Sequence, residues 1–208
     1  MYNCIKIEHP LVKHYLSELR DKNVKVDQFR ESFRKITPLI LYKATEDLLT
    51  QTKNIETPLG NTDTQVLLNR HTVIPILRAG LSMLPCFLES LPNCRIGFIG
   101  ICRNDDTYLP ELYYKNLPKD VENDNVIILE PMIATSGSIC LALDILRNHG
   151  VKNIRVVSLL MFHGAIEKIC EKFPDVKIYC CDIDLELDIN NYIVPGIGDA
   201  GDRFFGNI

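Results

Sequence analysis

Residues 126–150 place an apolar strand, a short polar turn and an amphipathic helix in direct succession. Val126 to Leu129 form an unbroken apolar run, which is typical of a parallel strand covered by helices on both faces. Apolar residues recur between Ile139 and Leu146 at the spacing of one helix face, and Gly150 supplies a helix stop. This unit restricts the chain to an α/β architecture.

The same alternation continues along the chain from residue 73. Apolar strands are predicted at residues 73–77, 95–102, 126–129, 154–160 and 176–181, and helices at 82–90, 138–149 and 164–173. Repeated strand–helix–strand units imply a parallel sheet wound on both faces. We therefore predict an α/β fold, a parallel sheet with helices on both faces.

The two ends of the chain depart from this alternation. Apolar spacing predicts a short helix at Val12, Tyr15, Leu16 and Leu19, and a second at Phe29, Phe33, Ile36 and Ile40 that is bent or restarted near Pro38. Residues 54–69 indicate a small hairpin or loop. We predict one domain over residues 1–208, with N-terminal helices in 1–53, an α/β core in 70–181 and a hood with the tail in 182–208.

The turn between strand and helix carries Thr135, Ser136, Gly137 and Ser138. Free backbone N–H groups and the positive end of the helix dipole favour a bound phosphate at such a helix N-terminus. The turn lacks the lysine of a triphosphate-binding loop and the dinucleotide glycine fingerprint. Glu130, at the carboxyl end of the strand, would accept hydrogen bonds from sugar hydroxyls. A sugar phosphate is the predicted ligand, and an ordinary Ser- or Thr-capped connection is the alternative.

The segment from Glu130 to Ser138 resembles the phosphoribosyl-pyrophosphate (PRPP) motif of the type I phosphoribosyltransferases, in the proline-containing form of the uracil phosphoribosyltransferase family. Further segments resemble that family over essentially the whole chain. They are its opening (9–14), its pyrophosphate loop (73–81), the start of its flexible loop (103–107), its uracil-binding loop (192–203) and its ending (205–206).

This resemblance implies a type I phosphoribosyltransferase-like fold and transfer of the phosphoribosyl group of PRPP to uracil, giving UMP and diphosphate. The implied catalytic residues are Arg78, Arg103 and Asp199. PRPP would be bound by these three and by the motif residues Glu130, Pro131, Met132, Ile133, Ala134, Thr135, Ser136, Gly137 and Ser138. Uracil would be contacted at Ile193, Gly198, Asp199 and Ala200.

Plainer interpretations of these residues stay open. Arg78 is placed to stabilise a leaving pyrophosphate, and Gly80 would let a ligand approach the backbone, but a lone arginine is by default a surface salt bridge. The polar segment from Arg103 to Lys115 is either a lid that excludes water or a loop of solvated charges. The C-terminal loop is either a base-binding turn or a Gly-rich surface turn with Asp199 as its cap.

The chain also departs from the family pattern. Glu130 stands where the uracil enzymes usually carry Asp, and ribose binding should survive the extra methylene. Ser136 stands where Gly is common, which would cost on the order of 1 kcal/mol if the position needs a positive φ. Residues 162–164 and 185–186 differ as well.

Composition narrows the function classes. A net charge of −4 over 208 residues argues against a nucleic-acid surface, and no apolar stretch approaches the ~20 residues that span a bilayer. The charged N-terminal segment is no signal peptide, so a cytoplasmic enzyme is expected. Eight cysteines include no C-x-x-C pair, and we expect reduced core residues. The adjacent Cys180 and Cys181 should point to opposite faces of a strand.

Partners follow from the resemblance. Mg²⁺ is implied by the charge of PRPP, with its protein ligands left unnamed. Relatives form homo-oligomers, and some are activated by GTP, so a homo-oligomer is expected and a GTP effector is left open. The alternative function is a non-catalytic regulatory homologue that binds PRPP or UMP. Another alternative is the same reaction on a different base.

Overall fold

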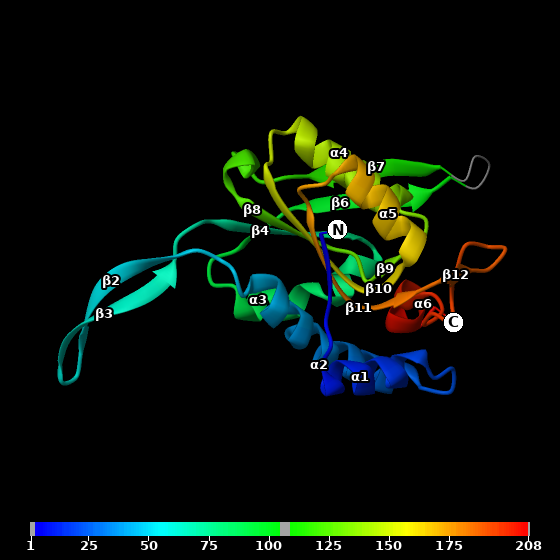
Figure 1. Cartoon of the computed structure of the whole chain (residues 1–208), viewed down its shortest axis with the longest axis horizontal. Coiled ribbons are helices and arrows are strands. Elements are labelled where there is room, and N and C mark those ends of the chain that lie inside the picture. The colour runs from blue at the N-terminus through cyan, green and yellow to red at the C-terminus, as the bar shows by residue number, and fades with distance from the viewer. Residues whose placement is uncertain (1–2, 105–108, 208) are drawn as a thin grey trace.

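A central sheet with helices on both faces forms the body of the protein, as a computed structural model describes it for residues 3–104 and 109–207 (Figure 1). The strand order is β1-β11-β10-β8-β4-β6-β7, with β5 beside β4 and β9 beside β10. The strands are Cys4–Lys6 (β1), His71–Leu77 (β4), Arg95–Ile96 (β5), Phe98–Arg103 (β6), Pro110–Asn116 (β7), Asn125–Leu129 (β8), Met132–Ile133 (β9), Asn153–Phe162 (β10) and Lys177–Asp184 (β11).

The predicted parallel sheet is confirmed, because the strands pair in parallel except for the antiparallel edge pair β6–β7. The sequence did not predict the two edge strands. β1 has three residues, too few for a pattern, and β7 is exposed along most of its length. The predicted strand 95–102 is split at Gly97 into β5 and β6. β11 extends beyond residue 181 because it pairs with β10 as far as Asp184.

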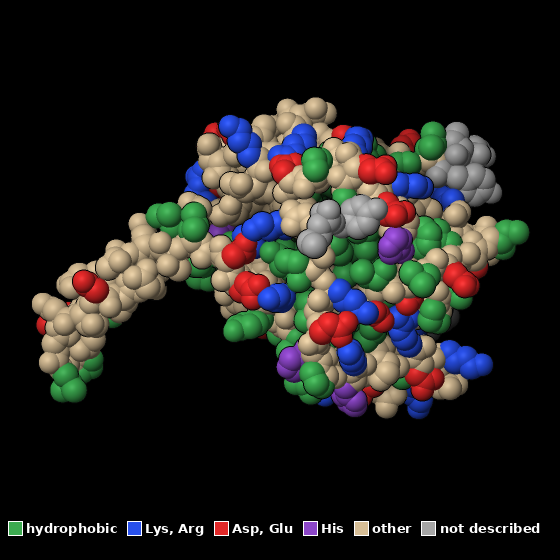
Figure 2. Space-filling view, in the orientation of Figure 1, with side chains coloured by type: hydrophobic (Ala, Val, Ile, Leu, Met, Phe, Trp, Pro, Cys, Tyr) green, Lys and Arg blue, Asp and Glu red, His purple; other side chains and the backbone are tan. Residues whose placement is uncertain are grey.

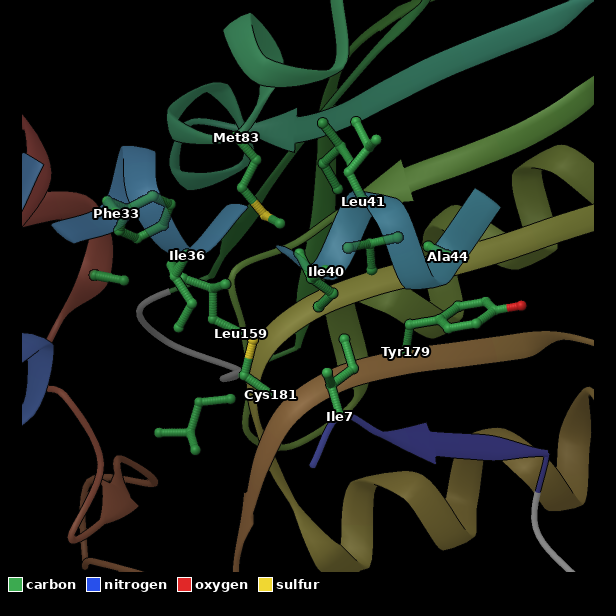
Figure 3. Packing of buried hydrophobic residues seen from close by; sticks show 14 of the residues in the cluster. Ile7, Phe33, Ile36, Ile40, Leu41, Ala44, Met83, Leu159, Tyr179 and Cys181 are labelled. Atoms are coloured by element: carbon green, nitrogen blue, oxygen red, sulfur yellow. The ribbon is translucent and has the colours of Figure 1, made fainter. Parts of the chain in front are cut away.

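Successive strand residues pack alternately into two hydrophobic cores, one on each face of the sheet. Val126 and Ile128 pack beneath α4 (Gly137–Asn148) and α5 (His163–Lys172). Ile127 and Leu129 face the opposite core, which is closed by α1 (Pro10–Arg20), α2 (Val26–Thr45) and α3 (Leu84–Ser90). Figure 3 shows this second core between α2 and the strands. Cys180 and Cys181 belong to different cores, which confirms that they point to opposite faces.

The N-terminal helices and the hairpin are also confirmed. α2 continues through Pro38, so of the two predicted alternatives the restart is wrong and the bend stays a prediction. Its buried face from Phe29 to Ala44 packs both halves on the sheet. The predicted helix 82–90 begins at Leu84, after a short 3₁₀ helix, η1 (Ala79–Ser82). A second 3₁₀ turn, η2, covers Val121–Asn123. The hairpin consists of β2 (Thr50–Thr57) and β3 (Gly60–Leu67), and it projects from the body (Figure 1).

The C-terminal segment lies at one end of the sheet. β12 (Glu186–Leu187) and β13 (Ile193–Val194) form a small separate sheet, and α6 (Ala200–Phe205) contacts both α2 and η1. The tail is thereby held between the N-terminal helices and the turn after β4. Within residues 3–104 and 109–207, no helix has both the length and the apolarity to cross a bilayer.

Candidate active site

A cavity of about 560 Å³ opens where β4, β6 and β8 end. Four segments that are far apart in sequence line it, and it brings together Arg78, Arg103, Glu130, Ser138 and Asp199. In parallel α/β sheets ligands bind at the carboxyl ends of the strands, which is where this cavity lies. The three predicted catalytic residues therefore share one cavity.

A smaller cavity of about 150 Å³ adjoins the first and shares Glu130 and Ser138 with it. Its lining is the predicted phosphate turn. The lining residues are Glu130, Met132, Ile133, Ala134, Thr135, Ser136, Gly137, Ser138 and Ile139. Because the turn leads into the first residues of the twelve-residue α4, its amides can serve an anion. Pro131 lines neither cavity, and its carbonyl instead accepts bonds from Leu159, Leu160 and Ser158 of β10.

Ser136, which stands where the family commonly has glycine, adopts the left-handed backbone conformation. Its φ is 67° and its ψ is −4°, directly before the first residue of α4. The Ser136 hydroxyl donates to the carbonyl oxygen of Thr135, so it is turned back onto the chain. A left-handed residue costs about 1 kcal/mol or more when it carries a side chain.

Ser136→Gly should therefore stabilise the protein by on the order of 1 kcal/mol and leave its activity intact or raised. Thermal unfolding and steady-state kinetics measure the two effects. A large loss of kcat/KM would show instead that the hydroxyl is a necessary phosphate donor.

Glu130 occupies the junction of the two cavities at the end of β8. Burial, and then repulsion from the Asp199 carboxylate, raises the pKa of Glu130 to about 8, although the Met132 backbone N–H partly stabilises the charged form. A carboxyl group held in this way is ready to pair with hydroxyl donors or a cation, because either would offset the cost of its charge.

The raised pKa makes stability depend on pH. The folded state holds the Glu130 proton more tightly than the unfolded chain, where the pKa is near its usual 4.5, so this contribution is fully present below pH 4.5 and is lost as pH rises through about 8. Glu130→Gln should melt at a similar temperature at pH 4.5 and several degrees above the wild type at pH 8.5. Equal melting temperatures across that range would contradict the assigned pKa.

Arg78 follows β4 after a cis Leu77–Arg78 peptide bond. Its side chain is 69% exposed, and its Nη2 lies 3.7 Å from Asp202 Oδ1 at the rim of the cavity. Arg78 therefore does form a surface salt bridge, which was the alternative to a role in binding pyrophosphate. Exposed ion pairs of this kind contribute little to stability. Gly80 has a second reason to be glycine besides the predicted approach of a ligand to its backbone, which stays a prediction. A Cβ there would lie 2.4 Å from the Leu129 carbonyl oxygen, so glycine is required to pack the turn against β8.

Arg103 is the last residue of β6 and lines the same cavity. Its Nη1 lies 3.5 Å from the Asn190 carbonyl oxygen in the C-terminal segment. The predicted lid from Arg103 to Lys115 is largely a strand, because β7 pairs with β6. Asp105, Asp106, Thr107 and Tyr108 of that prediction lie outside the described residues.

The sequence missed Tyr113 and Asp202 as lining residues of the cavity. The ring of Tyr113 packs over Gly100, where a Cβ would lie 2.6 Å from it. A glycine between Ile99 and Ile101 in an apolar strand was the available signal for a close approach.

Asp199 has two roles. Its Oδ1 accepts a hydrogen bond of 2.8 Å from the Asp202 N–H, so it caps α6, and its side chain also lines the cavity. Ile193, Gly198 and Ala200 do not line the cavity. The side chains of Ile193 and Ala200 are buried, which leaves backbone groups for any contact with a base.

Few side chains of the cavity could bind Mg²⁺ directly. No group of three or more His, Cys, Asp or Glu side chains in the described ranges is placed to hold a metal. The carboxylates of Glu130 and Asp199 face one cavity. This fits a cation carried mainly by substrate phosphates and water, which is usual for Mg²⁺.

Comparison with known proteins agrees with this geometry. The family model described as uracil phosphoribosyltransferase matches residues 6–207. The chain belongs to the uracil phosphoribosyltransferase family. Proteins named uracil phosphoribosyltransferase from Finegoldia magna and Dictyoglomus turgidum are 46% and 44% identical to it. The alignments cover 96% of both chains for the first, and 97% of this chain and 98% of the relative for the second.

The fold of the chain is also similar to solved structures. The AQ2163 protein from Aquifex aeolicus superposes with a TM-score of 0.92 at 33% identity, over 97% of each chain. An adenine phosphoribosyltransferase from Trypanosoma brucei, in complex with AMP, pyrophosphate and ribose-5-phosphate, gives a TM-score of 0.59 at 14% identity, over 92% of this chain and 88% of its own. That second likeness shows the shared type I fold.

Proposed function

We propose that this uracil phosphoribosyltransferase family member transfers the phosphoribosyl group of PRPP to uracil, giving UMP and diphosphate. The observation that carries the proposal is the cavity in which Arg78, Arg103, Glu130, Ser138 and Asp199 meet. These residues come from the segments that the family uses for pyrophosphate, ribose, phosphate and base.

The reaction breaks the bond between ribose C1 and the pyrophosphate oxygen and forms a bond from C1 to a uracil nitrogen, whose N–H proton is released to the departing pyrophosphate or to water. Positive charge develops on the ribose ring and negative charge on the leaving group, so the site must stabilise both. Arg78 holds the leaving pyrophosphate, and Arg103 contributes a second cation to the same cavity. Asp199 supplies negative charge near the ribose. Mg²⁺, when bound, neutralises part of the phosphate charge.

The remaining groups bind and orient the substrates. The amides and hydroxyls of Thr135 to Ser138 hold the 5′-phosphate at the start of α4. Glu130 accepts hydrogen bonds from the ribose hydroxyls. Backbone groups of Ile193 and of residues 198–200 pair with the uracil edge, where cytosine would present a donor in place of an acceptor.

The test is direct formation of UMP. Purified protein with uracil, Mg²⁺ and PRPP should produce UMP, and orotate, hypoxanthine and cytosine in the same assay should not compete as substrates. Binding of PRPP or UMP without any turnover would reject the enzyme and favour the non-catalytic homologue. Turnover of another base would reassign the substrate.

We also propose that the chain forms a homo-oligomer through the β2–β3 hairpin. The hairpin stands away from the body as an arm (Figure 2), and the side chain of Leu59 at its tip is fully exposed. An isolated two-stranded hairpin is marginally stable in water, so a partner surface would stabilise it. Light scattering should give a mass above that of one chain, and a monomer would contradict this proposal. GTP as an effector and a cytoplasmic location stay proposals on the family likeness alone.

A further inference from the structure

Two arginine side chains connect the C-terminal end of α1 to the loop that precedes α6 through hydrogen bonds. Arg203, on α6, donates to the carbonyl oxygens of Leu19, Asp21 (2.7 Å) and Ile197 (2.8 Å). Arg20, the last residue of α1, reaches in the opposite direction toward the loop. The two helices thus bind the neighbouring residues Gly196 and Ile197 of the loop.

Arg20 makes the more specific set of contacts. Its Nη1 donates to Asp184 Oδ2 (2.8 Å) and to the Gly196 carbonyl oxygen (3.0 Å), and its Nη2 donates to Asp184 Oδ1 (2.8 Å) and to Asp182 Oδ2 (3.0 Å). The Gly196 N–H donates to the same Asp184 Oδ2 at 3.0 Å. The Arg20–Asp184 ion pair therefore binds both backbone polar groups of Gly196. The side chain of Asp184 is only 8% exposed.

Gly196 sets the shape of the loop. Its φ is +61°, and a Cβ there would lie 2.0 Å from the Ile193 carbonyl oxygen, so the turn closes tightly on itself. Asp199, which lines the cavity, follows three residues later. Only Ile197 separates Gly196 from Gly198 and Asp199, so a displacement of Gly196 would shift the backbone of these two residues.

We propose that Arg20, acting with Asp184, is a positioning residue for the base: it fixes the backbone of residues 196–199 in the shape that reads uracil. This inference rests on the proposed function. Neither side chain lines the cavity, so both act through the loop. The guanidinium fork is needed because it spans a carboxylate and a carbonyl at once, whereas the ammonium of a lysine is a single point charge.

Arg20→Lys in the full chain is the test variant. It should raise the KM for uracil about tenfold and the KM for PRPP by less, because Asp199 is the only PRPP-binding residue in this loop and the phosphate turn and Arg78 are untouched. The matched control is Arg147→Lys. Arg147 is similarly buried and likewise combines carbonyl and carboxylate acceptors, namely the carbonyl oxygens of Val151 and Lys152 (both 2.9 Å) and the carboxylate of Asp175, but it lies at the far end of α4. Its replacement should leave both KM values unchanged.

Each outcome decides between the claims. An active wild type whose Arg20→Lys variant keeps the uracil KM, or raises both KM values equally, would overturn this inference alone. A wild type that makes no UMP would overturn the proposed function and this inference with it. If Arg20→Lys does not fold, Asp184→Asn serves instead. It keeps one acceptor oxygen for the Gly196 N–H but loses the negative charge and the second oxygen that pair with Arg20, and it should show the same selective rise in the uracil KM; no such rise would overturn the inference.

Discussion

Asp199→Asn should lower kcat/KM for UMP formation by well over tenfold, a loss of more than about 1.4 kcal/mol of transition-state stabilisation, without unfolding the protein. Asparagine keeps the side-chain oxygen that accepts from the Asp202 N–H, and it is among the best helix N-caps. The substitution therefore removes a negative charge from the cavity and little else. Steady-state kinetics with both substrates, together with thermal unfolding, separate the two effects.

Asp199→Asn should also change the pKa of Glu130. Because the Asp199 carboxylate contributes to the raised pKa of Glu130, removing that charge should lower this pKa and shift the alkaline stability loss to lower pH. Asp188→Asn is the control, since Asp188 Oδ1 accepts the N–H groups of Asn190 and Tyr192 in the same hood away from the cavity. Near-normal kinetics for Asp199→Asn would show that Asp199 is only the cap of α6.

Arg78→Ala should also lower kcat/KM by well over tenfold, because it removes a cation at the place where pyrophosphate gains charge. Little stability should be lost, since the side chain is 69% exposed and its ion pair with Asp202 spans 3.7 Å. The measurement is kcat/KM for PRPP at saturating uracil, with circular dichroism to verify folding.

A matched control for Arg78 lies on α2. Arg34 has the same exposed fraction, 69%, and pairs with Glu31 at 2.7 Å, remote from the cavity. Arg34→Ala should leave kcat/KM unchanged. If both variants behave alike, Arg78 is a surface ion pair and the plainer interpretation was correct.

Local sequence predicted the phosphate turn because its parts are contiguous. The strand, the turn and the helix that present residues 130–138 follow one another, so periodicity and turn chemistry were enough to place them. The departure at Ser136 was informative for the same reason, since a positive φ is a property of one residue and its neighbours. The parallel sheet followed from the repeated alternation of strands and helices.

Contacts between distant segments could not be predicted in this way. Position 80 must be glycine because a side chain there would clash with the carbonyl oxygen of Leu129 on β8. The Gly196 carbonyl oxygen accepts a hydrogen bond from Arg20 at the end of the first helix. β7 was missed because an exposed edge strand has no apolar pattern, and its partner β6 alone defines it. Each of these features depends on which segments meet in space.

The most direct test of the account is a crystal structure with UMP bound. The account predicts the phosphate of UMP on the amides of Thr135 to Ser138, the ribose hydroxyls at Glu130, and the uracil edge against the backbone of Ile193 and residues 198–200. A structure in which UMP occupies a different site and this turn holds no phosphate would contradict it.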